Sequence, residues 1–368
     1  DHGFDINIGG FHSGSPKGGY FSPYKNPNLK NKVDGENLSI RLANETSSFI
    51  KEHKQEPFFA FLSFYAVHGP IQTNQEKWQK YKEKATLKGV KKSGYKMEKK
   101  LPIRQVQDNP IYAGLVETMD DAVGLVLNAL KENNLDKNTI VIFTSDNGGV
   151  ASGDNFSTSN LPYKGGKGYQ WEGGIREPYL IYVPWRNSNV NSSDYPVTGA
   201  DFYPTILEYA NIDLLENEHK DGISLKSIID KNQVPNERSL YWHYPHYGNQ
   251  GGDPSSIIRK GKWKLIHYYE NNSNELYNLE NDPFEKKNFA KKEVEVTKEL
   301  LLNLKNWLVA VNAKYPKVDS LFNQKKRELY DNQIKNKKLP SLEKQRLKML
   351  SINFRPNKDW WGSKITKD

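Results

Sequence analysis

The residues with the clearest chemical potential are Asp146 and Asn147, which follow the apolar, β-branched run from Ile140 to Phe143. Such a run is typical of a buried strand in a parallel sheet, and open α/β sheets carry their functional groups at the carboxyl ends of their strands. A carboxylate and an amide side by side are hard oxygen donors, which suit Ca²⁺ or Mg²⁺ better than zinc. The pair therefore predicts a divalent-cation site, although an ordinary exit from a strand can have the same residues.

A glycine-rich segment follows in residues 165–178, with the sequence GGKGYQWEGGIREP. Glycines allow the backbone to approach an anionic group closely, and Lys167 adds a positive charge. We expect Glu172 and Arg176 to hold this loop in shape through an ion pair or through bonds to the backbone. The segment therefore predicts a site for an anion, and a solvated surface loop is the alternative.

Together, the two segments resemble the metal-ligand and lysine segments of the type I, formylglycine-dependent sulfatases of the alkaline phosphatase superfamily. The resemblance continues in order over residues 1–313 and includes ELYNLENDPFE at 275–285. It implies an alkaline-phosphatase-like α/β fold, with a mixed, mainly parallel sheet flanked by helices. It also implies a smaller C-terminal α+β subdomain, made of an antiparallel sheet and a helix.

The resemblance implies roles for individual residues. Asp146 and Asn147 match part of a metal site that usually holds Ca²⁺, with Mg²⁺ as the second choice. Lys167 matches the lysine that contacts the sulfate and its bridging oxygen, and it lies inside Gly-Lys-Gly whereas the neighbouring Lys164 does not. His68, in AVHGP, matches a histidine at a strand end that can donate to the sulfate or to the leaving oxygen.

The nucleophile implied by the resemblance is a formylglycine, made from the cysteine or serine of a Cys/Ser-x-Pro/Ala-x-Arg motif. The chain contains no cysteine and no such motif, and it begins without a methionine or a signal peptide. A calcium ion takes about six to eight oxygen ligands. We therefore expect that a missing N-terminal segment supplies the nucleophile and the remaining ligands, and that the chain alone is inactive.

Composition narrows the class of partner. The 368-residue chain has a formal net charge of +9, much of it in the lysine-rich residues 91–100 and 325–348. No basic helix or nucleic-acid module is recognisable, so we do not expect a nucleic-acid partner. No apolar run reaches the roughly 18 residues of a membrane span. A sulfated polysaccharide suits the positive charge.

The periodicity of apolar residues predicts the elements that position these groups. Helices are expected at 38–54, 111–133, from 201 to about 210 and at 294–313, and strands at 140–144, at 179–184 and in the run that ends at His68. Short antiparallel strands are expected at 239–244, 256–259 and 262–269. The alternation of helix and strand favours a parallel sheet. We divide the chain into a catalytic α/β domain (1–236), a C-terminal α+β subdomain (237–313) and an extension (314–368).

Three histidines are candidates for binding substrate. His243 and His246 lie in YWHYPHY, and His12 lies in GGFHSGSP. They could bind sugar hydroxyls, but core packing of the aromatic residues explains the first motif equally well.

The sequence as a whole predicts a sulfuric ester hydrolase that removes sulfate from a sulfated carbohydrate, either a polysaccharide or its oligosaccharides. The resemblance to bacterial enzymes implies a periplasmic or secreted protein. One alternative is a phosphodiesterase or phosphonate hydrolase of the same superfamily. Another is a relative that binds carbohydrate without catalysis.

Overall fold

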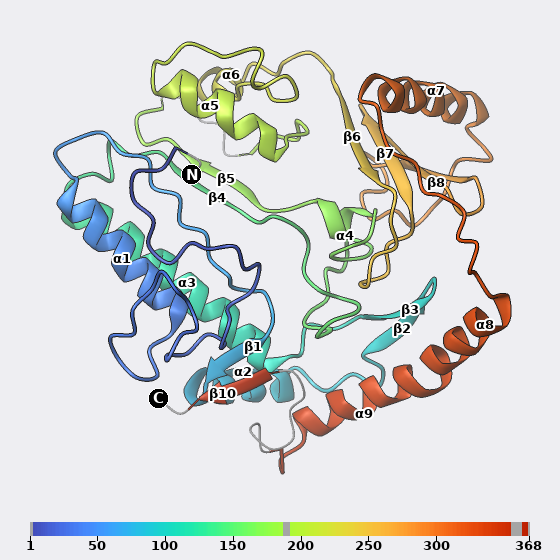
Figure 1. Cartoon of the computed structure of the whole chain (residues 1–368), viewed down its shortest axis with the longest axis horizontal. Helices are drawn as coiled ribbons and strands as arrows, with labels where there is room; N and C mark the ends of the chain where they lie inside the picture. Colours follow the sequence, from blue (N-terminus) through green and yellow to red (C-terminus); the bar gives the residue numbers. More distant parts are fainter. Residues whose placement is uncertain (1–2, 187–191, 355–362, 367–368) are drawn as a thin grey trace.

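The structure is a computed structural model that describes residues 3–186, 192–354 and 363–366. Two long helices, α1 (Leu38–Glu52) and α3 (Pro110–Glu132), lie side by side (Figure 1). Both helices were predicted and both are confirmed. Asn37 caps α1 by accepting the N–H of Ser39, and Asn109 caps α3 with proline at the first helical position, where its missing N–H costs nothing.

Strand β4 (Val141–Thr144) leads to the candidate site. It pairs antiparallel with β5 (Tyr179–Tyr182), with Phe143 opposite Leu180. Both predicted strands are present, but β4 is not the buried parallel strand expected from its apolar sequence. In the described parts of the chain β5 is its only ladder partner, and its residues are half-buried or exposed.

The strand predicted to end at His68 is not formed as a strand. Residues 57–65 form no helix and join no ladder in the described chain. Phe58, Leu62 and Phe64 are half-buried, whereas the three residues from Phe59 to Phe61 are exposed. A strand needs a hydrogen-bonded partner as well as a suitable sequence, and no described segment pairs with these residues.

The remaining elements of this part of the chain are short. Strand β1 pairs in parallel with β10, and β2 and β3 form an antiparallel hairpin. The bounds of these strands and of the shorter helices are β1 Ile71–Asn74, β10 Ser363–Thr366, β2 Tyr95–Glu98, β3 Leu101–Arg104, α2 Gln75–Leu87, α4 Glu172–Ile175, α5 Phe202–Tyr209 and α6 Lys226–Lys231.

The C-terminal subdomain contains the predicted antiparallel sheet and helix. Its four strands lie in the order β6 (Ser239–Tyr244), β7 (Ser255–Lys260), β8 (Trp263–Tyr268) and β9 (Ser273–Asn278). Helix α7 (Val294–Ala310) packs Leu300, Leu304 and Leu308 against Ile258 and Leu265 of the sheet. Strand β9, most of which lies in the ELYNL signature, is not among the predicted strands, the last of which ends at residue 269.

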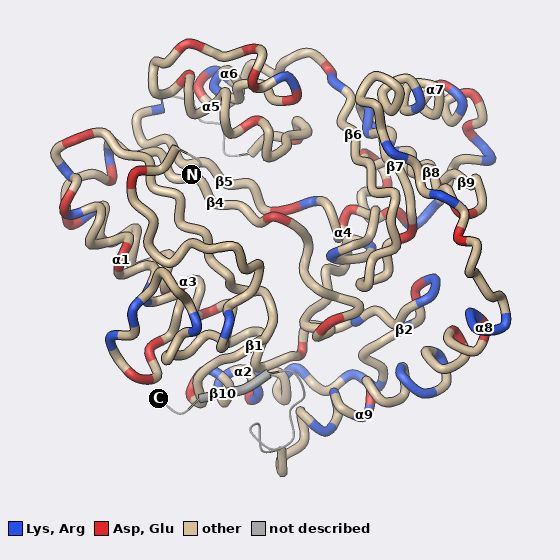
Figure 2. The backbone as a smooth tube through the Cα atoms, viewed as in Figure 1, with Lys and Arg blue, Asp and Glu red and all other residues tan. Residues whose placement is uncertain are grey.

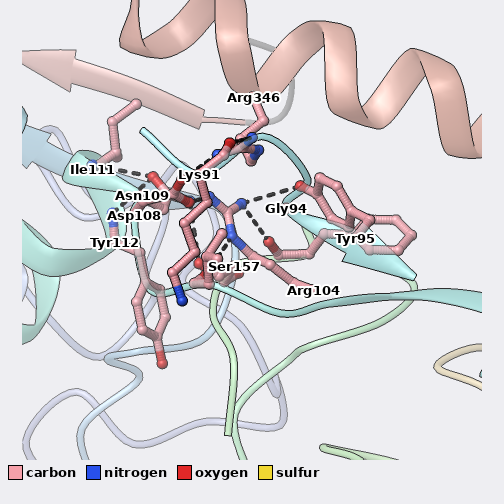
Figure 3. Close-up of polar contacts among 12 residues, drawn as sticks. Lys91, Gly94, Tyr95, Arg104, Asp108, Asn109, Ile111, Tyr112, Ser157 and Arg346 are labelled. Carbon is pink, nitrogen blue, oxygen red and sulfur yellow. Dashed lines mark hydrogen bonds and ion pairs between the residues drawn. The ribbon is translucent and has the colours of Figure 1, made fainter. Parts of the chain in front are cut away.

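The C-terminal extension contains two helices, α8 (Gln324–Gln333) and α9 (Leu339–Leu350), which follow the lower right edge of the molecule in Figure 1. Arg346 of α9 is fully buried and lies 2.5 Å from the carboxylate of Asp108, which also pairs with Arg104 of β3 at 2.5 Å (Figure 3). These pairs fasten the extension to the start of α3. None of the helices in the described ranges is long and apolar enough to span a membrane.

A buried ionic cluster joins the C-terminal sheet to the rest of the chain. Lys264 of β8 is fully buried, and its Nζ lies 2.9 Å from Glu172 Oε1 and 2.8 Å from Glu285 Oε1. Glu285 Oε2 also accepts the backbone N–H of Glu172 at 2.6 Å. Burial raises the pKa of Glu285, and the charge of Lys264 opposes that rise. The cluster anchors the first residue of α4 to the C-terminal sheet.

We predict that Lys264→Ala destabilises the protein by about 3–5 kcal/mol, because the substitution leaves two buried carboxylates without their cation. The matched control is Lys260→Ala, which removes an exposed ion pair with Glu299 and should change stability little. Urea denaturation of both variants measures the difference. Equal stability of the two variants would contradict a structural role for the cluster.

Candidate functional site

The donor atoms at the end of β4 are free. Asn147 donates its Nδ2 to the carbonyl of Gly148 at 3.0 Å, and its Oδ1 accepts no hydrogen bond from the described chain. The carboxylate of Asp146 likewise has no ion pair or hydrogen bond among the described residues. The segment is nevertheless held in place, because Thr144 Oγ1 donates to the carbonyl of Pro178 at 2.9 Å. Two oxygen donors are therefore presented without competing partners.

The glycine-rich loop packs directly against this segment. The N–H of Gly148 donates to the carbonyl of Gly174 at 3.1 Å, and the N–H of Lys167 donates to the carbonyl of Gly149 at 3.1 Å. A Cβ atom at position 148 would collide with the carbonyl of Gly173, so this contact requires glycine. The loop thereby brings Lys167 to the same end of β4 as Asp146 and Asn147.

The structure distinguishes the two neighbouring lysines. Lys164 lies over aromatic rings, with its Nζ 3.8 Å from the centroid of Trp171 and 5.8 Å from that of Tyr277. This is a cation–π arrangement that holds the ammonium group within the loop. Lys167 is half-buried, and its Nζ forms no ion pair, hydrogen bond or ring contact in the described residues. Lys167 is therefore the lysine that can receive an anion.

Glu177 is a further carboxylate at this site, which sequence reasoning did not single out. Its Oε1 is buried without a hydrogen-bond partner in the described chain. Burial, together with the negative charge of Asp146, raises the pKa of Glu177 to about 7. Two neighbouring carboxylates that lack a cation suit a hard divalent ion. The signal in the sequence was its place in GIREP, directly after the loop arginine.

The described residues do not complete a metal site. Within the described ranges there is no group of three or more His, Cys, Asp or Glu side chains that could hold a metal ion. Asp146 and Asn147, with Glu177 beside them, are of the right chemical type for calcium but too few for its usual coordination number. Any cation bound here needs ligands from other groups.

His68 presents one free ring nitrogen. Its Nδ1 lies 2.9 Å from the carbonyl of Gly69, and because a carbonyl can only accept, Nδ1 carries the proton. Nε2 has no hydrogen-bond partner among the described residues. The backbone of His68 is held by Tyr20, whose hydroxyl donates to its carbonyl at 2.7 Å. Asn155, from the loop that follows Gly149, touches Gly69. No hydrogen bond or ion pair in the described chain joins His68 to Lys167 or Asp146.

The loop after His246 reaches the glycine-rich segment. Asn249 and Gln250 donate their side-chain amides to the two carboxylate oxygens of Asp154, at 3.0 Å and 2.5 Å. Gly252 lies against the carbonyl of Gly168, the residue after Lys167. His246 is exposed at the start of this loop. The loop of residues 247–252 in the C-terminal subdomain thus packs against the backbone next to Lys167.

The other two candidate histidines are placed differently. His243 uses both ring nitrogens within the chain, since Nδ1 lies 2.7 Å from Ser256 Oγ and Nε2 lies 2.8 Å from the carbonyl of Lys314. These contacts hold the segment that follows α7 and favour a structural role. His12 is exposed and contacts the ring of Phe11. No described contact connects His12 with Lys167.

The chain is similar to known proteins. A family model described as Sulfatase matches residues 2–212, and one described as N-sulphoglucosamine sulphohydrolase, C-terminal, matches residues 166–314. A sulfatase of Formosa agariphila is 34% identical over 79% of this chain and 54% of its own length. Human steryl-sulfatase is 29% identical over 59% of this chain and 33% of its own length. The chain thus spans about half or less of these relatives.

Solved structures agree with this similarity. The crystal structure of Ps i-CgsB superposes with a TM-score of 0.62 at 26% identity, over 88% of this chain and 65% of that protein. The same protein in complex with k-i-k-neocarrahexaose gives a TM-score of 0.61. The alkaline-phosphatase-like fold expected from the sequence is confirmed by these neighbours.

The raised pKa of Glu177 predicts a pH-dependent stability. The folded carboxyl keeps its proton up to about pH 7, whereas the unfolded one loses it near pH 4.5. The stabilisation that the protonated carboxyl of Glu177 gives to the folded state is therefore complete at low pH and is lost as the pH rises through 7. In buffer with a chelator, Glu177→Gln should gain stability relative to the natural protein between pH 5 and pH 8.

Urea denaturation across this range measures the gain. Glu295→Gln, at an exposed position, is the control, and parallel stability curves for natural protein and Glu177→Gln would contradict the prediction.

Proposed function

The chain belongs to the sulfatase family, and we propose that the protein it forms is a sulfuric ester hydrolase that removes sulfate from a sulfated carbohydrate. One observation carries the proposal. The proposal is supported by the backbone hydrogen bonds from Lys167 to Gly149 and from Gly148 to Gly174, which bring the loop of Lys167 against the segment that carries Asp146 and Asn147. A cationic side chain beside oxygen ligands for a metal cation suits the binding of an oxyanion such as the sulfate group of an ester.

We propose Ca²⁺ as the metal, with Mg²⁺ as the alternative. Asp146 and Asn147 would be ligands, Glu177 would lie beside them, and the remaining ligands would come from outside this chain. The proposal is supported by the hard oxygen character of the donors and by the buried, unpartnered carboxylate oxygen of Glu177. When bound, the cation would polarise the sulfate oxygens.

Two side chains of this chain, Lys167 and His68, would bind the sulfate group and assist the departure of the alcohol. Lys167 would bind the sulfate and neutralise charge on its bridging oxygen as the ester bond breaks. His68, with Nδ1 held by the carbonyl of Gly69, would direct Nε2 to the substrate and, when protonated, donate a hydrogen bond to the leaving oxygen. We propose a formylglycine as the nucleophile, supplied from outside this sequence, since the chain contains no cysteine.

The substrate class follows from charge and from the neighbours. The net charge of +9 favours polyanions, and a structural neighbour at 26% identity binds a carbohydrate, k-i-k-neocarrahexaose. We propose that sugar residues bind along the loop of residues 247–252, which contacts Gly168 next to Lys167, with His246 at its start. His243 and His12 are weaker candidates for this role, because of the contacts described above. The bacterial relatives favour a periplasmic or secreted location.

Lys167→Ala in the complete protein should lower kcat by about 10²–10³-fold, the effect of removing one charge-stabilising group. The control is Lys231→Ala, at an exposed position of α6, which should leave turnover unchanged. Release of sulfate from a sulfated oligosaccharide measures both, with a phosphorylated analogue as a test of the alternative activity. Unchanged turnover in Lys167→Ala would exclude the proposed role.

Asp146→Ala should lower the calcium content of the complete protein, because it removes the charged ligand of the proposed site. Elemental analysis after dialysis against limiting calcium measures the loss. Asp136→Ala, away from the strand end, is the control. Full calcium occupancy in Asp146→Ala would show that the metal is held elsewhere.

A further inference from the structure

The backbone of the segment before His68 lacks hydrogen-bond partners among the described residues. In the described chain, none of the N–H or C=O groups of residues 57–64 has a hydrogen-bond partner. The sequence of the segment, PFFAFLSF, contains no charged residue. Phe58 packs onto the cluster formed by Ile50, Ala129 and Leu130, while Phe59 and Phe61 on the other face are 58% and 70% exposed. Backbone groups in so apolar a segment normally find partners in a sheet.

The strand that leads to Asp146 has an open edge on the same layer. β4 pairs with β5 along one side, and its other side has no ladder partner in the described ranges. Val141 of β4 packs onto the same Ile50–Leu130 cluster as Phe58. The two unpaired segments therefore lie on one apolar layer.

This edge lacks the features that normally protect an exposed strand. Edge strands usually carry lysine, proline or a bulge that prevents pairing, but β4 (VIFT) and β5 (YLIY) contain none of these residues. Figure 2 shows both strands without charged positions. Leu180 and Tyr182 of β5 are 61% and 57% exposed. Such a surface is typical of an interior sheet from which a neighbour is absent.

Residues 57–64 and β4 form no hydrogen bonds with each other in the described chain. Strands in a ladder lie about 4.8 Å apart and exchange hydrogen bonds, and no such bond joins residues 57–64 to β4. One further strand between them would pair with the open edge of β4 on one side and with residues 57–64 on the other.

We propose that this position, between residues 57–64 and β4, receives one apolar β-strand from a segment of the same polypeptide outside residues 1–368. The strand must be apolar on both faces, since Phe58 and Val141 flank one face and the exposed Phe59 and Phe61 the other. A segment of the same polypeptide is the favoured source because the chain covers 54% of a relative that is a single longer protein. The inference rests on the backbone and the apolar surface and is independent of the proposed reaction.

Residue-resolved hydrogen exchange of the complete polypeptide tests the proposal. The amides of residues 58–64 that face the new strand should exchange about 100-fold or more slowly than unstructured amides. Amides of β8, the strand between β7 and β9, are the internal control for a folded molecule. Unprotected amides at 58–64 in a molecule with protected β8 amides would overturn the proposal.

Substitutions separate a docked strand from other causes of protection. Phe61→Lys should abolish the protection of residues 58–64, whereas Phe61→Leu should retain it. Leu321→Lys, at a position that is 89% exposed, is the control and should have no effect. Protection that survives Phe61→Lys would overturn the proposal. Protection that increases with protein concentration, together with a dimer in size-exclusion chromatography, would assign the edge to a second copy and would also overturn it.

Discussion

The ionic cluster of Lys264, Glu172 and Glu285 is the interaction on which the rest of the structure depends. It is fully buried, and it bonds both the side chain and the backbone N–H of Glu172. Glu172 is the first residue of α4, within the glycine-rich loop, whereas Lys264 and Glu285 belong to the C-terminal subdomain. The loop that carries Lys167 therefore takes its position from the C-terminal sheet, because breaking a buried ion pair is costly.

This anchor explains why a loop so rich in glycine can still position a side chain. Glycine gives the backbone freedom to approach Gly148 and Gly149 closely, but the same freedom costs entropy when the loop is ordered. Hydrogen bonds to Gly148 and Gly149 fix one side of the loop, and Glu285 fixes the other. The backbone of Lys167 is thereby held in place, while its ammonium group has no partner in the part of the chain that the structure describes.

The candidate site carries unbalanced charge within the described chain. Asp146 and Glu177 lie close enough for one to raise the pKa of the other, and the ammonium group of Lys167 has no acidic partner. A protein that required only stability would pair such groups. Their arrangement instead suits ligands of both signs, a divalent cation and an oxyanion, and perturbed pKa values of this kind are common at functional sites. The backbone of β4 likewise has unpaired groups, because in the described ranges only one of its two edges joins a ladder.

The sequence alone predicted the features that depend on neighbouring residues. The helical period predicted α1 and α3, the apolar run predicted β4 with Asp146 and Asn147 after it, and the glycines around Lys167 marked the loop. Features that depend on distant residues could not be predicted in this way. Such features arise from contacts between segments far apart in the chain. They include the antiparallel partner of β4, the unpaired state of residues 57–64 and the burial of Lys264. The environment of Glu177 and the hydrogen bonds made by both ring nitrogens of His243 belong to the same group. The type of a side chain and its neighbours in sequence indicate which chemistry it can perform. Only the packing of distant segments determines which partners it contacts.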